Sequence, residues 1–347
     1  MGAAGNGMKR KLYLHIGTHR TATSTIQKFL QSNFCALIEK GVFHPYAAAR
    51  HSDLVGKLFE PGNRNALADC ASDIIARADA KAYPIHSITI SDEDLSSRKD
   101  LSPIEGLMDY FDVKIVLFLR RQDLWLESWY QQNVKWQWNP DLAHLTFAEY
   151  MARRQAFFWI DYDSRLRSLE WMFGEENIMC RVFEKGQMPQ GPVAAFCEAI
   201  GLKGRAGLIS GGAVNGSLSP MMTEFMRLLP LDQLPAAQRH EVEKACALAD
   251  AHRSAKSRLY LPPAARAEVM AEYARGNRAV ARRYFGRDQL FLDPIPSAEA
   301  PLADTGLPSH LPDLFRDLLA PVITALSRPA AEAAMVATRP GRRSDAA

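Results

Sequence analysis

Short, almost wholly apolar runs recur along the first half of the chain, and helix-like segments separate them. The runs cover Leu12–Ile16, His86–Ser91, Val113–Arg120 and Asn177–Phe183. Runs of this kind are typical of strands that are buried on both faces of a sheet. The intervening segments, such as TIQKFLQSNFCALIEK, have the apolar spacing of helices. This alternation predicts an α/β fold with βαβ units, three layers and a central parallel sheet of four or five strands.

The second half of the chain has a different pattern. After Gly201 there is no convincing strand, and helical stretches are expected at about 219–229, 235–255 and 263–285. From residue 293 the chain is rich in Pro and Ala and holds one amphipathic segment, LPDLFRDLLAPVITALS. We therefore predict one domain over residues 9–292, with a helical C-terminal flank. Residues 293–347 are predicted to be a partly helical extension with a disordered tail.

Composition excludes several classes of function. The charge balance of 42 − 39 = +3 is too small to indicate nucleic acid or a membrane surface as the main partner. The five cysteines form no CxxC pair and are odd in number, which indicates neither a zinc ribbon nor a disulfide framework. No apolar stretch is long enough for a membrane span, and the first residues lack the apolar core of a signal peptide. We expect a cytoplasmic protein.

The segment Gly17–Thr25, GTHRTATST, lies between the first predicted strand and a predicted helix. A loop of small residues at such a junction binds phosphate, because free backbone N–H groups and the helix dipole converge there. Aligning the pattern GxxxxGK[ST] on Gly17 puts Thr23 at the lysine position, so the Walker lysine is missing. The basic residue is Arg20, inside the loop, which favours a phosphate ester other than ATP or GTP. The alternative is an ordinary helix N-terminus capped by Thr23 or Ser24.

This loop resembles the 5′-phosphosulfate loop of sulfotransferases that use 3′-phosphoadenosine-5′-phosphosulfate (PAPS), which reads approximately T-x-K-T-G-T-T-S. The resemblance implies a P-loop-like fold and assigns the 5′ end of the donor to Arg20, Thr21, Ala22, Thr23, Ser24 and Thr25. Arg20 replaces the lysine of that pattern, and Ala22 replaces its glycine. Arginine stays protonated and does not readily donate a proton. Alanine requires a backbone that avoids positive φ or bears modest strain.

A second motif follows the third predicted strand, in LFLRRQDLWLESWYQQ. Arg120 closes the strand and Ser128 lies eight residues later on the next helix, which matches the spacing of the sulfotransferase 3′-phosphate motif. The resemblance therefore assigns Arg120 and Ser128 to the 3′-phosphate. Arg offers a planar fork to phosphate. Arg121 stands where the family usually has Asp or Asn, and is either a second positive charge or solvated. The tryptophans of this helix are expected in the core.

The second predicted strand leads into an acidic turn, SDEDLSS. In heparan-sulfate-type sulfotransferases the matching segment carries a catalytic glutamate, which implies that Glu93 is the catalytic base. Asp92 and His19 remain alternatives, whereas Asp94 is expected to begin or cap the next helix. The alternative interpretation is that the turn is a solvated acidic surface without a catalytic role.

Taken together, about residues 10–292 resemble bacterial sulfotransferases. The resemblance implies an enzyme that moves a sulfuryl group from PAPS to a hydroxyl or amine, with Glu93 and Arg20 as catalytic residues and no metal. The acceptor class stays open between a carbohydrate, a lipid-linked sugar and a small metabolite, and so does the oligomeric state. Two other interpretations are a P-loop nucleoside or metabolite kinase and a nucleotide-binding module without catalysis.

Overall fold

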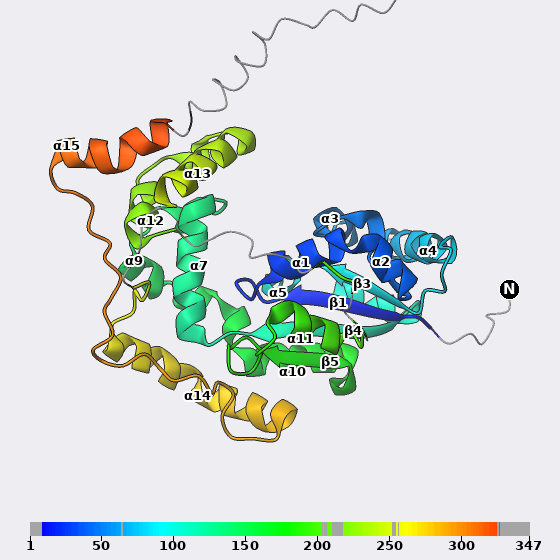
Figure 1. The fold of residues 1–347 in the computed structure, drawn as a ribbon. Coiled ribbons are helices and arrows are strands. Elements are labelled where there is room, and N and C mark those ends of the chain that lie inside the picture. The colour runs from blue at the N-terminus through cyan, green and yellow to red at the C-terminus, as the bar shows by residue number, and fades with distance from the viewer. Residues whose placement is uncertain are drawn as a thin grey trace, which may run out of the picture. The chain divides into compact units, whose positions relative to one another are not determined.

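The computed structural model describes residues 9–63, 65–202, 204, 207–209, 218–251, 255, 257–324 and 326. Their contacts divide the chain into two compact units. The first, here called the sheet unit, takes its residues from 1–125, 155–215 and 264–296. The second, the helical unit, takes its residues from 126–154, 216–263 and 297–347. Each unit therefore consists of segments that are distant in the sequence (Figure 1).

The sheet unit is built on five parallel strands in the order β2-β3-β1-β4-β5. Their bounds are β1 Lys11–Gly17, β2 Val42–Phe43, β3 Ser87–Ser91, β4 Asp112–Leu119 and β5 Ile178–Val182. The predicted α/β class with a central parallel sheet is confirmed, and so are four of its strands. β2 was not predicted because two residues are too short to show a periodic pattern. The central position of β1 places its carboxyl end between those of β3 and β4.

Both faces of the sheet are covered. Val116 and Phe118 of β4 belong to one apolar cluster with residues of α1 (Thr23–Ser32) and α11 (Pro192–Ala199). Their neighbours Ile115, Leu117 and Leu119 point to the opposite face and are equally buried. Helix α10 (Tyr162–Phe173) contacts both β4 and β5. Helices therefore enclose the sheet in three layers, which explains why the strand sequences are apolar throughout.

Further helices of the sheet unit follow the predicted alternation. They are α2 Phe34–Glu39, α3 Ser52–Leu58, α4 Ala66–Asp79, α5 Asp94–Ser97 and α6 Ser102–Glu105. The helical unit contains α8 Pro140–Ala143, α9 Phe147–Ala152, α12 Pro220–Arg227, α13 Ala236–Asp250 and α15 Leu311–Leu314. Helices α7 (Gln122–Trp136) and α14 (Pro263–Phe285) have residues in both units.

The described residues after Gly201 form helices and no strand, as predicted. Helix α14 has the predicted bounds, whereas α13 ends five residues before the predicted end at 255. In the C-terminal extension α15 continues into a π-helical stretch, Phe315–Leu319. The predicted disordered tail lies outside the described residues.

A buried ion cluster joins the start of α7 to α14 within the sheet unit. Asp123 is fully buried and accepts hydrogen bonds from Arg121, at 2.8 Å between Nε and Oδ1, and from Arg266. Arg121 also donates to the backbone carbonyls of Asp293 and Pro294. Burial alone would raise the pKa of Asp123, but the two arginines outweigh it and hold that pKa below its ordinary value. Arg121 is only 2% exposed, so the interpretation of this residue as a solvated charge was wrong.

We predict that Asp123→Asn lowers the free energy of unfolding by about 3–5 kcal/mol, because it leaves two buried guanidiniums without their shared counter-charge. Urea denaturation of the full chain measures this loss. Asp288→Asn is the control, since Asp288 pairs with Arg282 at the exposed surface, and its denaturation midpoint should match that of the unmodified chain. Equal midpoints for the Asp123 variant and the control would contradict the prediction.

Candidate active site

The loop between β1 and α1 is formed by an irregular strand end and an uncapped helix start. The pairing of β1 with β4 shifts register between His15 and Gly17. Helix α1 begins at Thr23, and its N-cap residue is Ala22, whose side chain has no hydrogen-bond acceptor. The alternative of a helix capped by Thr23 or Ser24 is therefore not what the chain forms. The first N–H groups of α1 have no carbonyl of their own helix to bond.

Residues with positive and with negative φ alternate along the backbone of this loop. Arg20 and Ala22 have positive φ values of 64° and 62°, and they alternate with Thr21 and Thr23, which are not in that region. Such alternation is the backbone conformation of a nest, in which successive N–H groups turn toward one point and can receive an anion. Ala22 does not avoid positive φ; it occupies the left-handed region, in which a side chain is strained.

The carbonyl groups of the loop are held by one donor of the loop itself and by two from elsewhere in the sheet unit. The Thr21 hydroxyl donates to the carbonyl of Thr18 at 2.5 Å, and Trp125 Nε1 donates to that of His19 at 2.8 Å. Arg120 Nη1 donates to the carbonyl of Arg20 at 2.8 Å. The carbonyl groups of three consecutive residues are thereby fixed.

Two guanidinium groups lie at this loop. Burial and the neighbouring charge of Arg120 lower the pKa of Arg20 to about 10, so Arg20 is still a cation at neutral pH. Arg120 follows the last residue of β4, and its guanidinium carbon lies 5.7 Å from the centre of the Phe183 ring. The backbone of Arg120 is held by Tyr162, whose hydroxyl donates to its carbonyl at 2.5 Å. Two like charges brought together on rigid elements favour an anion between them.

The other residues predicted from the sequence to bind PAPS lie in different surroundings. Thr21 is fully buried with its hydroxyl on Thr18, and Thr23 is 6% exposed, so both are positioned by packing. Ser24 is exposed and Thr25 is half-buried on the first turn of α1. Ser128 is 8% exposed and lies on the part of α7 that belongs to the helical unit.

Glu93 lies beside the start of the loop. A side chain built at Gly17, which has a φ of 93°, would place its Cβ 3.1 Å from Cβ of Glu93, so this close approach needs glycine. Gln27, one turn into α1, donates from Nε2 to Oε2 of Glu93 at 2.5 Å. The side chain of Glu93 is 12% exposed. The carboxylate is therefore held against the first turns of α1, next to the nest.

The other two acidic residues of the turn are engaged by Arg50. Its Nη2 lies 2.8 Å from Oδ1 of Asp92, and it also pairs with Asp94, while its Nη1 lies 3.7 Å from Glu93. Burial alone would lower the pKa of Arg50, but the three carboxylates outweigh it and raise that pKa. Asp92 is 1% exposed and also accepts from the backbone N–H of Asp94, where α5 begins. Asp92 is thus the most deeply buried carboxylate of the turn, whereas Glu93 and Asp94 both lie beside the loop, Asp94 at 3.5 Å from Nε2 of His19.

His19 is part of the loop but is 7% exposed. Burial lowers its pKa to about 4, although Asp94, 3.5 Å from Nε2, acts in the opposite direction. His19 is thus neutral at neutral pH. It remains an alternative base by position, with its backbone carbonyl committed to Trp125.

A cluster of neutral histidines lies beneath the acidic turn. His51 Nδ1 accepts from the backbone N–H of Ser91 and its Nε2 donates to the carbonyl of Pro45. His44 donates from Nε2 to the carbonyl of Ala48, and its ring centre lies 4.4 Å from that of His51. The backbone N–H of Ser91 can only donate, which fixes His51 in the Nε2–H tautomer. Nδ1 of His44 lies 3.1 Å from both the carbonyl and the hydroxyl oxygen of Thr89. The end of β3 is thereby joined to the chain segment after β2.

Several residues of the site were not singled out from the sequence. These are Gln27, Arg50, Trp125 as a donor to the loop, and Tyr162. Only Gln27 carried a signal, since it lies one helical turn after the loop. The others reach the site through tertiary contacts.

Among the residues that the structure describes, no group of three or more His, Cys, Asp or Glu side chains is arranged to hold a metal ion. Within the same residues, no helix has the length and apolar character that crossing a membrane requires.

The chain was compared with family models, with curated proteins and with solved structures. No model of a known protein family matches the chain. Over 181 residues it is 28% identical to an uncharacterised protein of Archaeoglobus fulgidus, and the match covers 52% of this chain and 48% of that protein. The chain thus spans about half the length of that relative. A crystal structure of a sulfotransferase from Alicyclobacillus acidocaldarius matches 67% of this chain and 99% of its own, with 16% identity and a TM-score of 0.39.

We predict that Ala22→Gly stabilises the protein by up to about 1 kcal/mol, because glycine removes the cost of a left-handed side-chain-bearing residue. Thermal unfolding of the full chain measures the change. Ala76→Gly, at an exposed position inside α4, is the matched control and should lower stability by about 1 kcal/mol. If both variants lost stability equally, the backbone strain at Ala22 would be refuted.

Stability should decrease as the pH falls below 6.5. Burial lowers the pKa of His15 and of His44 to about 3 and lowers that of His51. Below pH 6.5 the unfolded chain binds protons at these rings and the folded chain does not, so each ring removes up to about 1.4 kcal/mol of stability per pH unit. Urea midpoints between pH 7 and pH 5 measure the slope. His44→Gln should make it shallower, and an unchanged slope in that variant would contradict this assignment.

Proposed function

We propose that this protein is a sulfotransferase that transfers a sulfuryl group from PAPS to a hydroxyl or amine of an acceptor. The observation that carries the proposal is the meeting of a backbone nest, two guanidiniums and one carboxylate at a single strand–loop–helix junction. A nest with flanking arginines binds a phosphate ester. A carboxylate beside it can take the proton of an attacking hydroxyl.

The roles follow from position. The N–H groups of residues 20–24 and the exposed hydroxyl of Ser24 would bind the 5′-phosphosulfate. The N–H of Thr25 already donates to the carbonyl of Ala22 at 3.0 Å, so Thr25 would contribute its hydroxyl. Arg120, on the sheet unit, would bind the 3′-phosphate. The role of Ser128 stays a prediction from the sequence, because Ser128 belongs to the helical unit. An anionic donor would relieve the repulsion between Arg20 and Arg120, which contributes to lowering the pKa of Arg20. This relief favours an anionic ligand at the loop.

The transfer itself needs three events. The acceptor oxygen attacks sulfur in line with the leaving oxygen, and a new S–O bond forms while the S–O bond to the 5′-phosphate breaks. The acceptor proton passes to Glu93. Negative charge develops on the leaving phosphate oxygen, where Arg20 and the loop N–H groups stabilise it. The products are the sulfated acceptor and adenosine 3′,5′-bisphosphate.

We predict that the full chain binds adenosine 3′,5′-bisphosphate in calorimetry. Arg120→Ala should weaken binding about 10-fold to 100-fold, as expected for the loss of one hydrogen bond to a charged group. Glu93→Gln should bind it unchanged but lower the turnover number about 10²-fold to 10⁴-fold. Turnover is followed by mass spectrometry as a product heavier by SO₃ when protein and PAPS are added to cell extract.

Arg167→Ala is the control, because Arg167 lies exposed on α10 and pairs only at the surface with Asp163. Magnesium-dependent phosphoryl transfer from ATP would contradict the proposal and show that the protein is a kinase. Binding of the bisphosphate without turnover on any acceptor would favour a nucleotide-binding module. Full turnover by Glu93→Gln would refute the role of that carboxylate.

A further inference from the structure

Gln27 is a polar residue on the buried side of helix α1. The apolar cluster of the sheet unit includes Ile26, Phe29 and Leu30 of this helix. Gln27 is buried with them and is only 5% exposed. Positions on the core-facing side of a helix are normally apolar, because burying an amide costs free energy unless it finds a partner. A residue that breaks such a local pattern is typical of a functional site.

The partner of this buried amide is the carboxylate of Glu93. Nε2 of Gln27 lies 2.5 Å from Oε2 of Glu93. An ionised carboxylate can only accept hydrogen bonds, so the amide must present its NH₂ group to it. The side chain of Glu93 is 12% exposed, which shields the bond from most of the surrounding water. A hydrogen bond in such surroundings is stronger than one in water.

The two oxygens of Glu93 have different surroundings. Oε2 accepts from Gln27, whereas Oε1 accepts no hydrogen bond from the residues that the structure describes. Nη1 of Arg50 lies 3.7 Å from Oε1, which is too far for a hydrogen bond, and Nη2 of Arg50 is engaged by Asp92 and Asp94. With Oε2 held by the amide, Oε1 is the oxygen left to receive a proton.

Helix α1 joins this carboxylate to the anion-binding loop. The helix begins at Thr23, and Gln27 lies four residues later, which is about 6 Å along the helix axis. The N–H groups at the start of α1 are proposed to bind the 5′-phosphosulfate. One rigid element would therefore hold the donor at its first turn and, through Gln27, the proposed base. Transfer between two bound groups requires that their distance and orientation be fixed.

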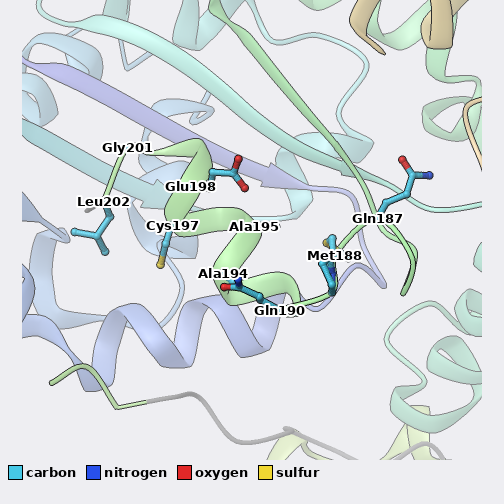
Figure 2. A pocket seen from close by; sticks show the side chains of 11 residues that line it. Gln187, Met188, Gln190, Ala194, Ala195, Cys197, Glu198, Gly201 and Leu202 are labelled. Atoms are coloured by element: carbon cyan, nitrogen blue, oxygen red, sulfur yellow. The ribbon is translucent and has the colours of Figure 1, made fainter. Parts of the chain in front are cut away.

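Two cavities of the sheet unit do not have Glu93 in their walls. One, of about 540 Å³, is lined by side chains on α11 and on the segments before and after that helix (Figure 2). The other, of about 640 Å³, is lined by residues of α3, α4 and the segment after β2, and it includes Arg50. Because Glu93 lines neither cavity, its orientation is set by the side chains that contact it.

We propose that Gln27 is a positioning residue for the transfer, whose amide holds Oε2 of Glu93 and so presents Oε1 to the acceptor. This inference rests on the proposed function, because it requires Glu93 to act as the base. The acceptor proton passes to Oε1 as the acceptor oxygen attacks sulfur, and the bond between Gln27 and Oε2 stays intact. Without the amide, the carboxylate can rotate and its oxygens leave the reactive position.

The test compares Gln27→Met with Gln31→Met in the full chain. Methionine is close to glutamine in length and has no N–H donor. Gln31 is the matched control, since it lies one turn further along α1, is exposed and donates to the backbone carbonyl of Ala47. With PAPS and cell extract, Gln27→Met should lower the turnover number about 10-fold to 100-fold and leave the KM for PAPS unchanged. Gln31→Met should leave both unchanged.

A double variant shows whether Gln27 acts through Glu93. In the Glu93→Gln chain, adding Gln27→Met should lower the remaining turnover no further, because the base is already absent. A general defect of α1 would lower turnover by the same factor with and without Glu93. In calorimetry, Gln27→Met should bind adenosine 3′,5′-bisphosphate as tightly as the unmodified chain, since the N–H groups at the start of α1 are unchanged.

The outcomes separate this inference from the proposed function. Equal turnover by Gln27→Met and Gln31→Met would refute the role of Gln27 and leave the sulfotransferase standing. Weaker binding of the bisphosphate by Gln27→Met, or the same loss of turnover in both backgrounds, would make Gln27 a structural residue and overturn the inference. An unmodified chain without turnover on any acceptor would refute the proposed function, and this inference with it.

Discussion

The carbonyl groups of the loop after β1 are held by donors that come from distant parts of the chain. Trp125 Nε1 holds His19, and the guanidinium of Arg120 holds Arg20. With these acceptors satisfied, the loop can keep alternating positive φ values, and its N–H groups form the nest. The conformation of the loop therefore depends on hydrogen bonds to its carbonyl groups, in addition to its small residues.

Strand order brings the other parts of the site to the same edge. Because β1 lies between β3 and β4, the carboxyl ends of the three strands place the loop, the acidic turn and Arg120 together. Open parallel sheets commonly bind ligands at this edge. Gly17 makes the approach close enough for Glu93 to lie against the loop. The glycine is needed both for its positive φ and for the absence of a side chain.

The arginines of the site fall into two groups. Arg50 engages the acidic turn, whereas Arg20 and Arg120 lie at the loop and repel each other. Repulsion between like charges on rigid elements costs stability that packing elsewhere must offset, and such local cost is typical of functional sites. The neutral histidines beneath the turn serve the opposite purpose, because they fill the interior and bond the backbone without adding charge.

Much of the architecture could be predicted because it follows from local sequence patterns. Apolar runs identified four strands, and the alternation with helices identified a parallel sheet. The small-residue loop and the arginine at the end of β4 marked the two candidate anion-binding positions. Local patterns could not show β2, which has two residues, nor that Arg121 pairs with buried Asp123 instead of facing solvent.

By itself, the sequence determined the succession of most strands and helices along the chain and the places where the chain leaves the sheet. Apolar periodicity and small residues set these features because they depend only on residues a few positions apart. Tertiary structure alone decided which side chains meet there. Arg50 reaches Asp92 across 42 residues, Gln27 reaches Glu93 across 66, and Trp125 reaches His19 across 106. These contacts arise from the packing of whole elements, for which no short stretch of sequence carries a signal.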